Sequence, residues 1–130
     1  MDTVSRDKLK IKGFKRLKNS FKYALEGLVF AFKYEQNIIV HTLATIVVII
    51  LGVFFKISYL EWLILFLIIG LVIATELINT SIEATIDLVT KETHPLAKIA
   101  KDTAAAVMVF AIIAVILGLM IFIPKILALV

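Results

Sequence analysis

The 130-residue chain contains no cysteine, and the missing thiol excludes three kinds of chemistry. The chain can form no disulfide scaffold, no thiolate metal site and no cysteine nucleophile. Glycine and proline are scarce, with five and two residues, and neither glycine-rich phosphate loop, GxxxxGK[ST] or GxGxxG, occurs. Any nucleotide site must therefore be built from side chains and a metal ion.

Apolar side chains are in excess: they make up 62% of the residues, and the mean hydropathy is +1.05. A soluble domain is about half apolar, so part of this surface must face lipid. Three stretches approach the ~20 residues that cross the hydrocarbon layer of a bilayer. They are residues 36–55, 57–75 and 103–123, and Glu61 is the only charged residue in them.

The apolar stretches predict an all-α membrane protein, a single domain over residues 1–130. Its three transmembrane helices are expected at residues 35–56, 58–89 and 95–124. The second should continue past the bilayer because residues 74–89 contain neither glycine nor proline. Pro95 suits the first turn of the third helix, and Pro124 is expected to close that helix.

Basic residues are concentrated near the N-terminus, where eight of the fourteen lysines and arginines lie between Arg6 and Lys22. Residues 1–12 are expected to form a basic tail. In residues 13–34, apolar residues recur along one side of a helix and basic residues lie between them. This pattern predicts an amphipathic helix on the membrane surface. The positive-inside rule places the N-terminus in the cytoplasm and the C-terminus outside, in a multi-pass protein of the cell membrane.

Four polar side chains share one face at the end of the second span: Glu76, Asn79, Glu83 and Asp87. At 3.6 residues per turn they form a column roughly 80° wide, in which Glu76 and Glu83 lie ~10 Å apart along the axis. That distance is too long for both to bind one magnesium ion, whose ligands lie ~2.0–2.1 Å away. Glu76, at the hydrocarbon boundary, is placed to take the proton of a lipid hydroxyl. Glu83 and Asp87, nearer the cytosol, could hold magnesium and its phosphates.

Lysines and an arginine that could bind a polyphosphate are Lys98 and Lys101 on the third helix and Arg16 on the surface helix. Purely structural roles stay open for these polar residues. Glu83 and Asp87 could form a solvated helix end, Glu76 could pair with Lys101, and Asn79 could make an interhelical hydrogen bond. Lys98 could be a membrane anchor, and His41 could be a packed side chain.

An oligomer is expected because three spans enclose little polar space. A charged side chain facing lipid costs roughly 2.5–3.5 kcal/mol. Helices of neighbouring copies would shield the acidic side chains of Glu35, Glu76, Glu83 and Asp102.

The segment "TELINTSIEATIDLVTKETHPLAKIAKDTAAAV" resembles the signature region of the small prokaryotic membrane lipid kinases, the diacylglycerol kinase and undecaprenol kinase family. It contains the pattern E-x-x-N-[ST]-x-I-E-x-x-x-D, then a polar connector with histidine, then A-K-D and small residues. "GFKRLKNSFKYALEGL" and "YEQN" extend the resemblance from residue 13 to about residue 123.

The resemblance implies an ATP-dependent lipid kinase that uses Mg²⁺ and forms a homotrimer with active sites shared between chains. Glu76 corresponds to the general base that takes the proton of the lipid alcohol, and Lys101 lies with it at the lipid substrate. Glu83 and Glu35 correspond to the magnesium-binding carboxylates.

The resemblance also implies the nucleotide side of the site. Arg16 and Lys101 correspond to phosphate contacts, and Asn79 to a polar residue near the γ-phosphate. The remaining positions around the nucleotide are Glu83, Asp87, Glu92, His94 and Asp102.

Two departures bear on the lipid. "TAAAV" lacks the Gly-Ser of the enterobacterial branch, and Glu26 replaces a basic residue there. They favour undecaprenol, converted to undecaprenyl phosphate, over diacylglycerol, converted to phosphatidic acid. From the residues alone, a proton-coupled exporter and a non-enzymatic assembly subunit are the alternatives, and no nucleic acid partner is expected.

Overall fold

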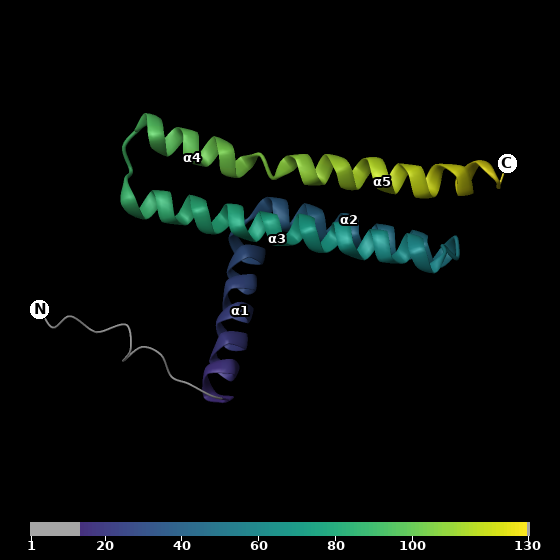
Figure 1. Ribbon diagram of the computed structural model, residues 1–130, viewed down its shortest axis with the longest axis horizontal. Coiled ribbons are helices and arrows are strands. Elements are labelled where there is room, and N and C mark those ends of the chain that lie inside the picture. The colour runs from purple at the N-terminus through teal and green to yellow at the C-terminus, as the bar shows by residue number, and fades with distance from the viewer. Residues whose placement is uncertain (1–13, 130) are drawn as a thin grey trace, which may run out of the picture. The chain divides into compact units, whose positions relative to one another are not determined.

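The computed structural model describes residues 14–129, so the predicted basic tail at residues 1–12 lies outside the described residues. It divides into two compact units, Met1–Tyr34 and Glu35–Val130. The described residues form five helices and no strand (Figure 1). Three helical segments are long and apolar enough to cross a membrane. The predicted all-α membrane fold is confirmed.

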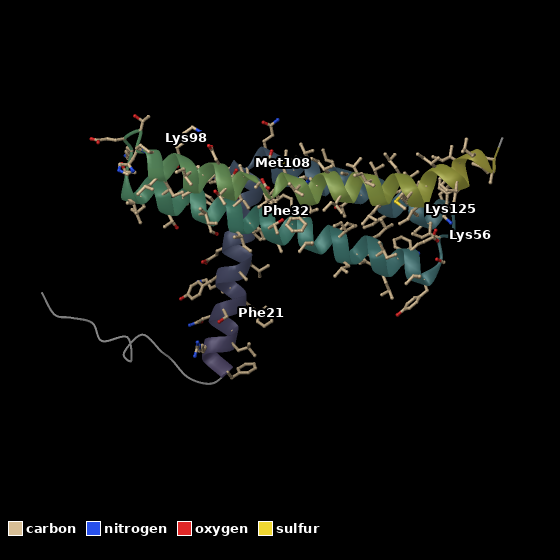
Figure 2. The ribbon with its side chains drawn as sticks, turned by 45° about the horizontal axis from the view of Figure 1, so that its top comes forward. Phe21, Phe32, Lys56, Lys98, Met108 and Lys125 are labelled. Atoms are coloured by element: carbon tan, nitrogen blue, oxygen red, sulfur yellow. The ribbon has the colours of Figure 1, made fainter. Side chains whose placement is uncertain are left out.

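The described part of the first unit is helix α1, Phe14–Tyr34. Its apolar stripe is exposed along the helix, and Figure 2 shows Phe21 projecting from it. The exposed fractions of Phe14, Phe21 and Leu25 are 83%, 66% and 63%. An apolar stripe this exposed, beside basic residues, is typical of a helix that lies on a lipid surface.

The second unit starts at Glu35, whose extended backbone (φ −105°, ψ 111°) separates α1 from α2, Gln36–Phe54. A tight turn then leads from α2 into α3, Tyr59–Val89. Lys56 adopts a left-handed conformation (φ 50°) in this turn, and Ile57 N–H donates to the carbonyl of Gly52 at 3.1 Å. This pattern closes the C-terminus of a helix and reverses the chain.

Helix α3 begins with a capping box that was not predicted from the sequence. Ser58 N–H donates to Glu61 Oε2 at 2.6 Å, and Glu61 N–H donates to Ser58 Oγ at 3.3 Å. The other carboxylate oxygen of Glu61 pairs with Lys125 Nζ at 3.0 Å. The start of α3 is thereby tied to the end of α5, Met108–Leu127.

Helix α3 is the central element, in contact with α2, with α5 and with α4, Pro95–Ala105 (Figure 1). Its packing core contains Ile57, Leu65 and Phe122. Gly52 allows a close approach of α2 and α3, because a Cβ there would lie 2.7 Å from Trp62 Cη2.

The third predicted span differs from the structure at two points. Its helix is interrupted at Ala106 and Val107, where N–H groups bond to carbonyls three residues earlier, as in a 3₁₀ turn. Its C-terminal part continues three residues past Pro124, to Leu127. A proline removes one helical hydrogen bond, and this one lies in the last turn, where the helix has few bonds left to lose.

Candidate functional site

The C-terminal half of α3 carries the acidic column, and burial decreases along it. Glu76 is 2% exposed and Asn79 is 7% exposed, whereas Glu83 is half-buried and Asp87 is exposed. One end of the column is thus buried and the other end is exposed. The division between a lipid-side and a water-side carboxylate stays a prediction.

Asn79 connects the two halves of the column. Its Nδ2 donates to Glu83 Oε1 at 3.1 Å, within α3. Its Oδ1 is buried and has no hydrogen-bond partner in the described residues, and the same holds for Thr80 Oγ1. Buried polar atoms are normally paired, so these two oxygens mark a place where a ligand or another chain would bind.

The ion pair of Glu76 with Lys101, the structural alternative for Glu76, does not occur in the described residues. Lys101 Nζ instead pairs with Asp87 Oδ1 at 2.5 Å. Asp87 lies 11 residues beyond Glu76, or ~16 Å along the helix axis. Lys101 therefore belongs to the open end of the column, away from the buried carboxylate.

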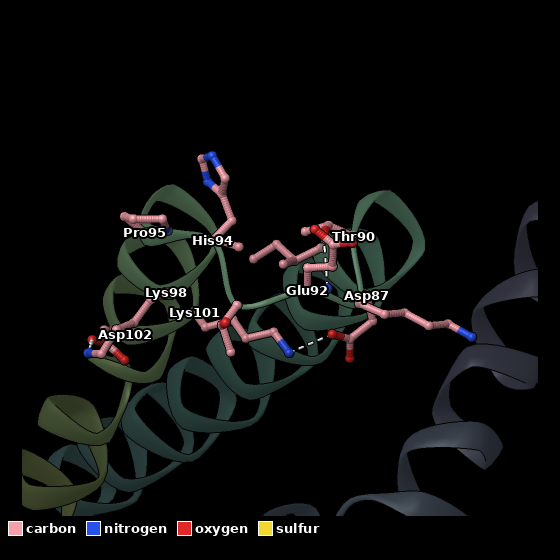
Figure 3. A pocket seen from close by; sticks show the side chains of 12 residues that line it. Asp87, Thr90, Glu92, His94, Pro95, Lys98, Lys101 and Asp102 are labelled. Carbon is pink, nitrogen blue, oxygen red and sulfur yellow. Dashed lines mark hydrogen bonds and ion pairs between the residues drawn. The ribbon is translucent and has the colours of Figure 1, made fainter.

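A pocket of about 570 Å³ lies between the end of α3 and the start of α4 (Figure 3). Its volume falls within the range of sites for small molecules. Five predicted nucleotide-side residues line it: Asp87, Glu92, His94, Lys101 and Asp102. Lys91 and Lys98 also line it. The structure thus brings together the polar residues of the connector and of both helices.

The connector between α3 and α4 owes its shape to two local hydrogen bonds. Thr90 Oγ1 accepts from Glu92 N–H at 3.1 Å, and His94 Nδ1 accepts from Leu96 N–H at 3.2 Å. His94 is therefore the N-cap of α4, with Pro95 in the first turn. The family resemblance predicts His94 near the nucleotide, and this capping role was not predicted.

Four charged side chains of the pocket form two exposed ion pairs. Lys98 forms an ion pair with Asp102 one turn further along α4, and Lys101 pairs with Asp87 across the two helices. Exposed ion pairs contribute roughly 0–1 kcal/mol. A phosphate group could therefore replace either carboxylate at little cost.

Helix register places Glu35 level with the column along the helix axes. Gly52 meets Trp62, and both helices rise about 1.5 Å per residue. Glu35, 17 residues before Gly52, is therefore roughly level with Asn79, 17 residues after Trp62. The Glu35 side chain is half-exposed and makes no capping hydrogen bond, which leaves its carboxylate available.

Magnesium suits this set of oxygen atoms. Among residues 14–129 no group of three or more acidic or histidine side chains is arranged to hold a metal ion. Magnesium does not require such a cage, since it is commonly held by one or two carboxylates and by the phosphates of its substrate. Glu83, the unpaired Oδ1 of Asn79 and Glu35 supply suitable donors.

Two further residues named in the sequence analysis, Arg16 and His41, belong to neither α3 nor α4. Arg16 is exposed on α1, and its carbonyl accepts from Ser20 Oγ at 3.0 Å. His41 is half-buried in α2, and its carbonyl accepts from Thr45 Oγ1 at 2.8 Å. Thr80 was not considered in the sequence analysis, although its place four residues after Glu76 puts it on the same helix face.

Comparison with known proteins gives consistent matches over most of the chain. The profile of the family described as prokaryotic diacylglycerol kinase matches residues 22–122. The undecaprenol kinase of Bacillus subtilis (strain 168) is 48% identical over 111 residues, which cover 85% of this chain and 90% of that protein.

Diacylglycerol kinases match over similar lengths of this chain. The enzyme of Synechocystis sp. is 39% identical over 112 residues, covering 85% of this chain and 64% of that protein. The enzyme of Helicobacter pylori (strain 26695) is 38% identical over 104 residues, covering 80% and 81%. All three similar proteins are named as lipid kinases, which decides against the exporter and the assembly subunit.

Proposed function

The chain belongs to the prokaryotic diacylglycerol kinase family and is a lipid kinase, and we propose that it transfers the γ-phosphoryl group of ATP to undecaprenol. The observation that carries this proposal is the continuity of α3. The same helix carries the carboxylate of Glu76, which is 2% exposed, and three turns further on, at Asp87, it lines a pocket that contains charged side chains. A lipid alcohol and a water-soluble nucleotide can approach one helix from opposite directions.

Glu76 is the general base in this proposal. Its carboxylate takes the proton of the lipid hydroxyl, and the lipid oxygen forms a bond to the γ-phosphorus. The bond from that phosphorus to the oxygen bridging the β- and γ-phosphates breaks, and ADP leaves with the electron pair. Glu76 then gives its proton to water. Phosphoryl transfer depends mainly on such positioning and on electrostatic stabilisation.

The nucleotide would occupy the pocket between α3 and α4. Lys101 and Lys98 would exchange their carboxylate partners for phosphate oxygens. A phosphate contact of Arg16 stays a prediction from the family resemblance. Asp87, Glu92, His94 and Asp102 would surround the rest of the nucleotide. Glu83 and Glu35, with Asn79, would hold Mg²⁺, which neutralises charge on the phosphate oxygens when bound.

The orientation and assembly proposed for the protein follow from charge and exposure. Basic residues favour a cytoplasmic N-terminus and connector, and an extracellular C-terminus. Large apolar side chains remain exposed along α2 and α5, and polar atoms remain unpaired on α3. A homotrimer with sites shared between chains would cover part of this surface, and the bilayer would cover the rest.

Undecaprenol is the preferred acceptor in this proposal because of the relatives. The named undecaprenol kinase is 48% identical and aligns over 90% of its length, against 39% and 38% for two diacylglycerol kinases. Diacylglycerol, the alternative, carries the same primary hydroxyl on an apolar molecule.

The test is a lipid phosphorylation assay with purified protein in detergent, radiolabelled ATP and Mg²⁺. Undecaprenol and diacylglycerol are offered separately and then in competition. We expect label in undecaprenyl phosphate, with a higher kcat/KM than for phosphatidic acid. A higher kcat/KM for diacylglycerol would overturn the acceptor assignment, and no label in either lipid would overturn the proposed reaction.

A further inference from the structure

Thr80 carries a buried hydroxyl group that the mechanism above does not use. The residue is 9% exposed, and its Oγ1 has no hydrogen-bond partner in the part of the chain that the structure describes. A hydroxyl can both donate and accept a hydrogen bond. Leaving it buried and unpaired costs free energy unless something binds it.

The free hydroxyl of Thr80 contrasts with other hydroxyl groups on these helices. Thr75 Oγ1 donates to the carbonyl of Leu71 at 2.8 Å, and Thr85 Oγ1 donates to that of Ser81 at 2.7 Å. The same bond to the carbonyl four residues earlier is made by Ser20, Thr42, Thr45 and Ser81. This local bond is the usual way for a helical threonine to satisfy its hydroxyl. Thr80 does not make it, so its hydrogen is free for another acceptor.

The position of Thr80 defines what that acceptor can be. It follows Glu76 by four residues and precedes Glu83 by three, so it lies about one turn from each on the same face. The neighbouring Asn79 Oδ1 is also buried and unpaired. The two free oxygens therefore lie between the general base and the carboxylate proposed to bind Mg²⁺. In the reaction, the group that passes through this interval is the transferring phosphoryl group.

We propose that Thr80 is a further catalytic residue whose Oγ1–H donates a hydrogen bond to a non-bridging oxygen of the transferring phosphoryl group. The inference rests on the proposed function. Charge is spread over these oxygens in the transition state, and a donor already oriented in a water-poor site stabilises such charge. Thr80 keeps its own proton throughout, so the proton transfer to Glu76 and the release of ADP are unchanged.

Two variants of Thr80 and a matched control test the proposal. Thr80→Val replaces the hydroxyl with a methyl group, and Thr80→Ser keeps the hydroxyl. Thr75→Val makes the same change one residue before Glu76, at a hydroxyl that already has local partners. The assay is lipid phosphorylation in detergent, with kcat and both KM values measured for undecaprenol and ATP.

We expect Thr80→Val to lower kcat by about 10- to 100-fold, the range for a hydrogen bond to a charged group. Both KM values should stay close to those of the wild type, because the bond is made mainly in the transition state. Thr80→Ser and Thr75→Val should keep most of the wild-type kcat. An unchanged kcat for Thr80→Val overturns the proposal.

Thermal unfolding and oligomeric state separate this role from a structural one. A hydroxyl bonded to a neighbouring chain would make Thr80→Val less stable or dissociate the oligomer, and that outcome overturns the proposal. We expect Thr80→Val to unfold at or above the wild-type temperature, since it removes an unpaired buried hydroxyl. If the wild-type protein phosphorylates neither lipid, the proposed function fails and the role of Thr80 fails with it. An active wild type beside an equally active Thr80→Val rejects the role of Thr80 alone.

Discussion

Asn79 Nδ2 and Glu83 Oε1 are joined by a hydrogen bond of 3.1 Å, one turn apart on α3. The bond holds the half-buried carboxylate of Glu83 in place, and it turns Asn79 Oδ1 away from Glu83 without a partner. Two oxygen atoms of the kind that magnesium prefers are thereby fixed before any ligand binds. A hydrogen bond from a neighbouring group orients a metal ligand and affects the affinity of the site for the metal.

The first prediction concerns Glu83 and magnesium. Glu83→Gln should raise the Mg²⁺ concentration for half-maximal activity by about tenfold or more, because it removes a charged ligand. Titration of lipid phosphorylation with Mg²⁺ at saturating ATP measures the effect. Glu26→Gln makes the same change on exposed α1 and should leave the titration as in the wild type. Identical Mg²⁺ curves for Glu83→Gln and wild type would refute the metal assignment.

The second prediction concerns Glu76. Glu76→Gln keeps the size of the side chain and removes its ability to take a proton, so kcat should fall by roughly 10²- to 10⁴-fold, the usual contribution of a general base. Equilibrium binding of a non-hydrolysable ATP analogue should be retained, because the nucleotide pocket lies three turns away. Glu61→Gln is the matched control at the other end of α3 and should keep turnover. Normal lipid phosphorylation by Glu76→Gln would show that another group is the base.

Much of the fold could be predicted because it depends on local patterns. Helix α3 ends at Val89 as expected, since nothing in residues 74–89 interrupts a helix. The interruption at Ala106 and Val107 was missed because neither residue is a helix breaker. The contact of Gly52 with Trp62 was also missed, because it joins two helices whose register the sequence does not specify.

The candidate site could be predicted only in part, for the same reason. Glu76, Asn79 and Glu83 share a face through helix periodicity alone, and the structure places them there. The pairing of Lys101 with Asp87 depends on the shape of the connector, which is defined by hydrogen bonds of Thr90 and His94. The local sequence of His94 did contain a signal, since a residue just before a proline at a helix start is a capping position.

The third prediction concerns Lys101 in the pocket. Lys101→Ala should raise the KM for ATP by about 10- to 100-fold, because it removes a charged hydrogen-bond donor to phosphate. Steady-state kinetics over a wide range of ATP measures this change. Lys56→Ala, in the turn between α2 and α3, removes an exposed lysine outside the pocket and should have no effect on KM. An unchanged KM for Lys101→Ala would mean that its pairing with Asp87 is its whole role.

The fourth prediction concerns the close approach of α2 and α3. Gly52→Ala should destabilise the protein by about 1–3 kcal/mol, the usual cost of overpacking, because its Cβ would lie 2.7 Å from Trp62 Cη2 and 2.9 Å from Cζ2. Trp62 is the only tryptophan, so its fluorescence reports unfolding in detergent at the site of the change. Gly118→Ala in α5 is the matched control: apart from its chain neighbours and the adjacent backbone of its own helix, no heavy atom of the described residues lies within 4 Å of the new Cβ, and alanine favours a helix over glycine. Gly118→Ala should therefore unfold at or above the wild-type temperature. If Gly52→Ala unfolds no earlier than Gly118→Ala, then α2 and α3 do not pack in the register that places Glu35 level with Asn79.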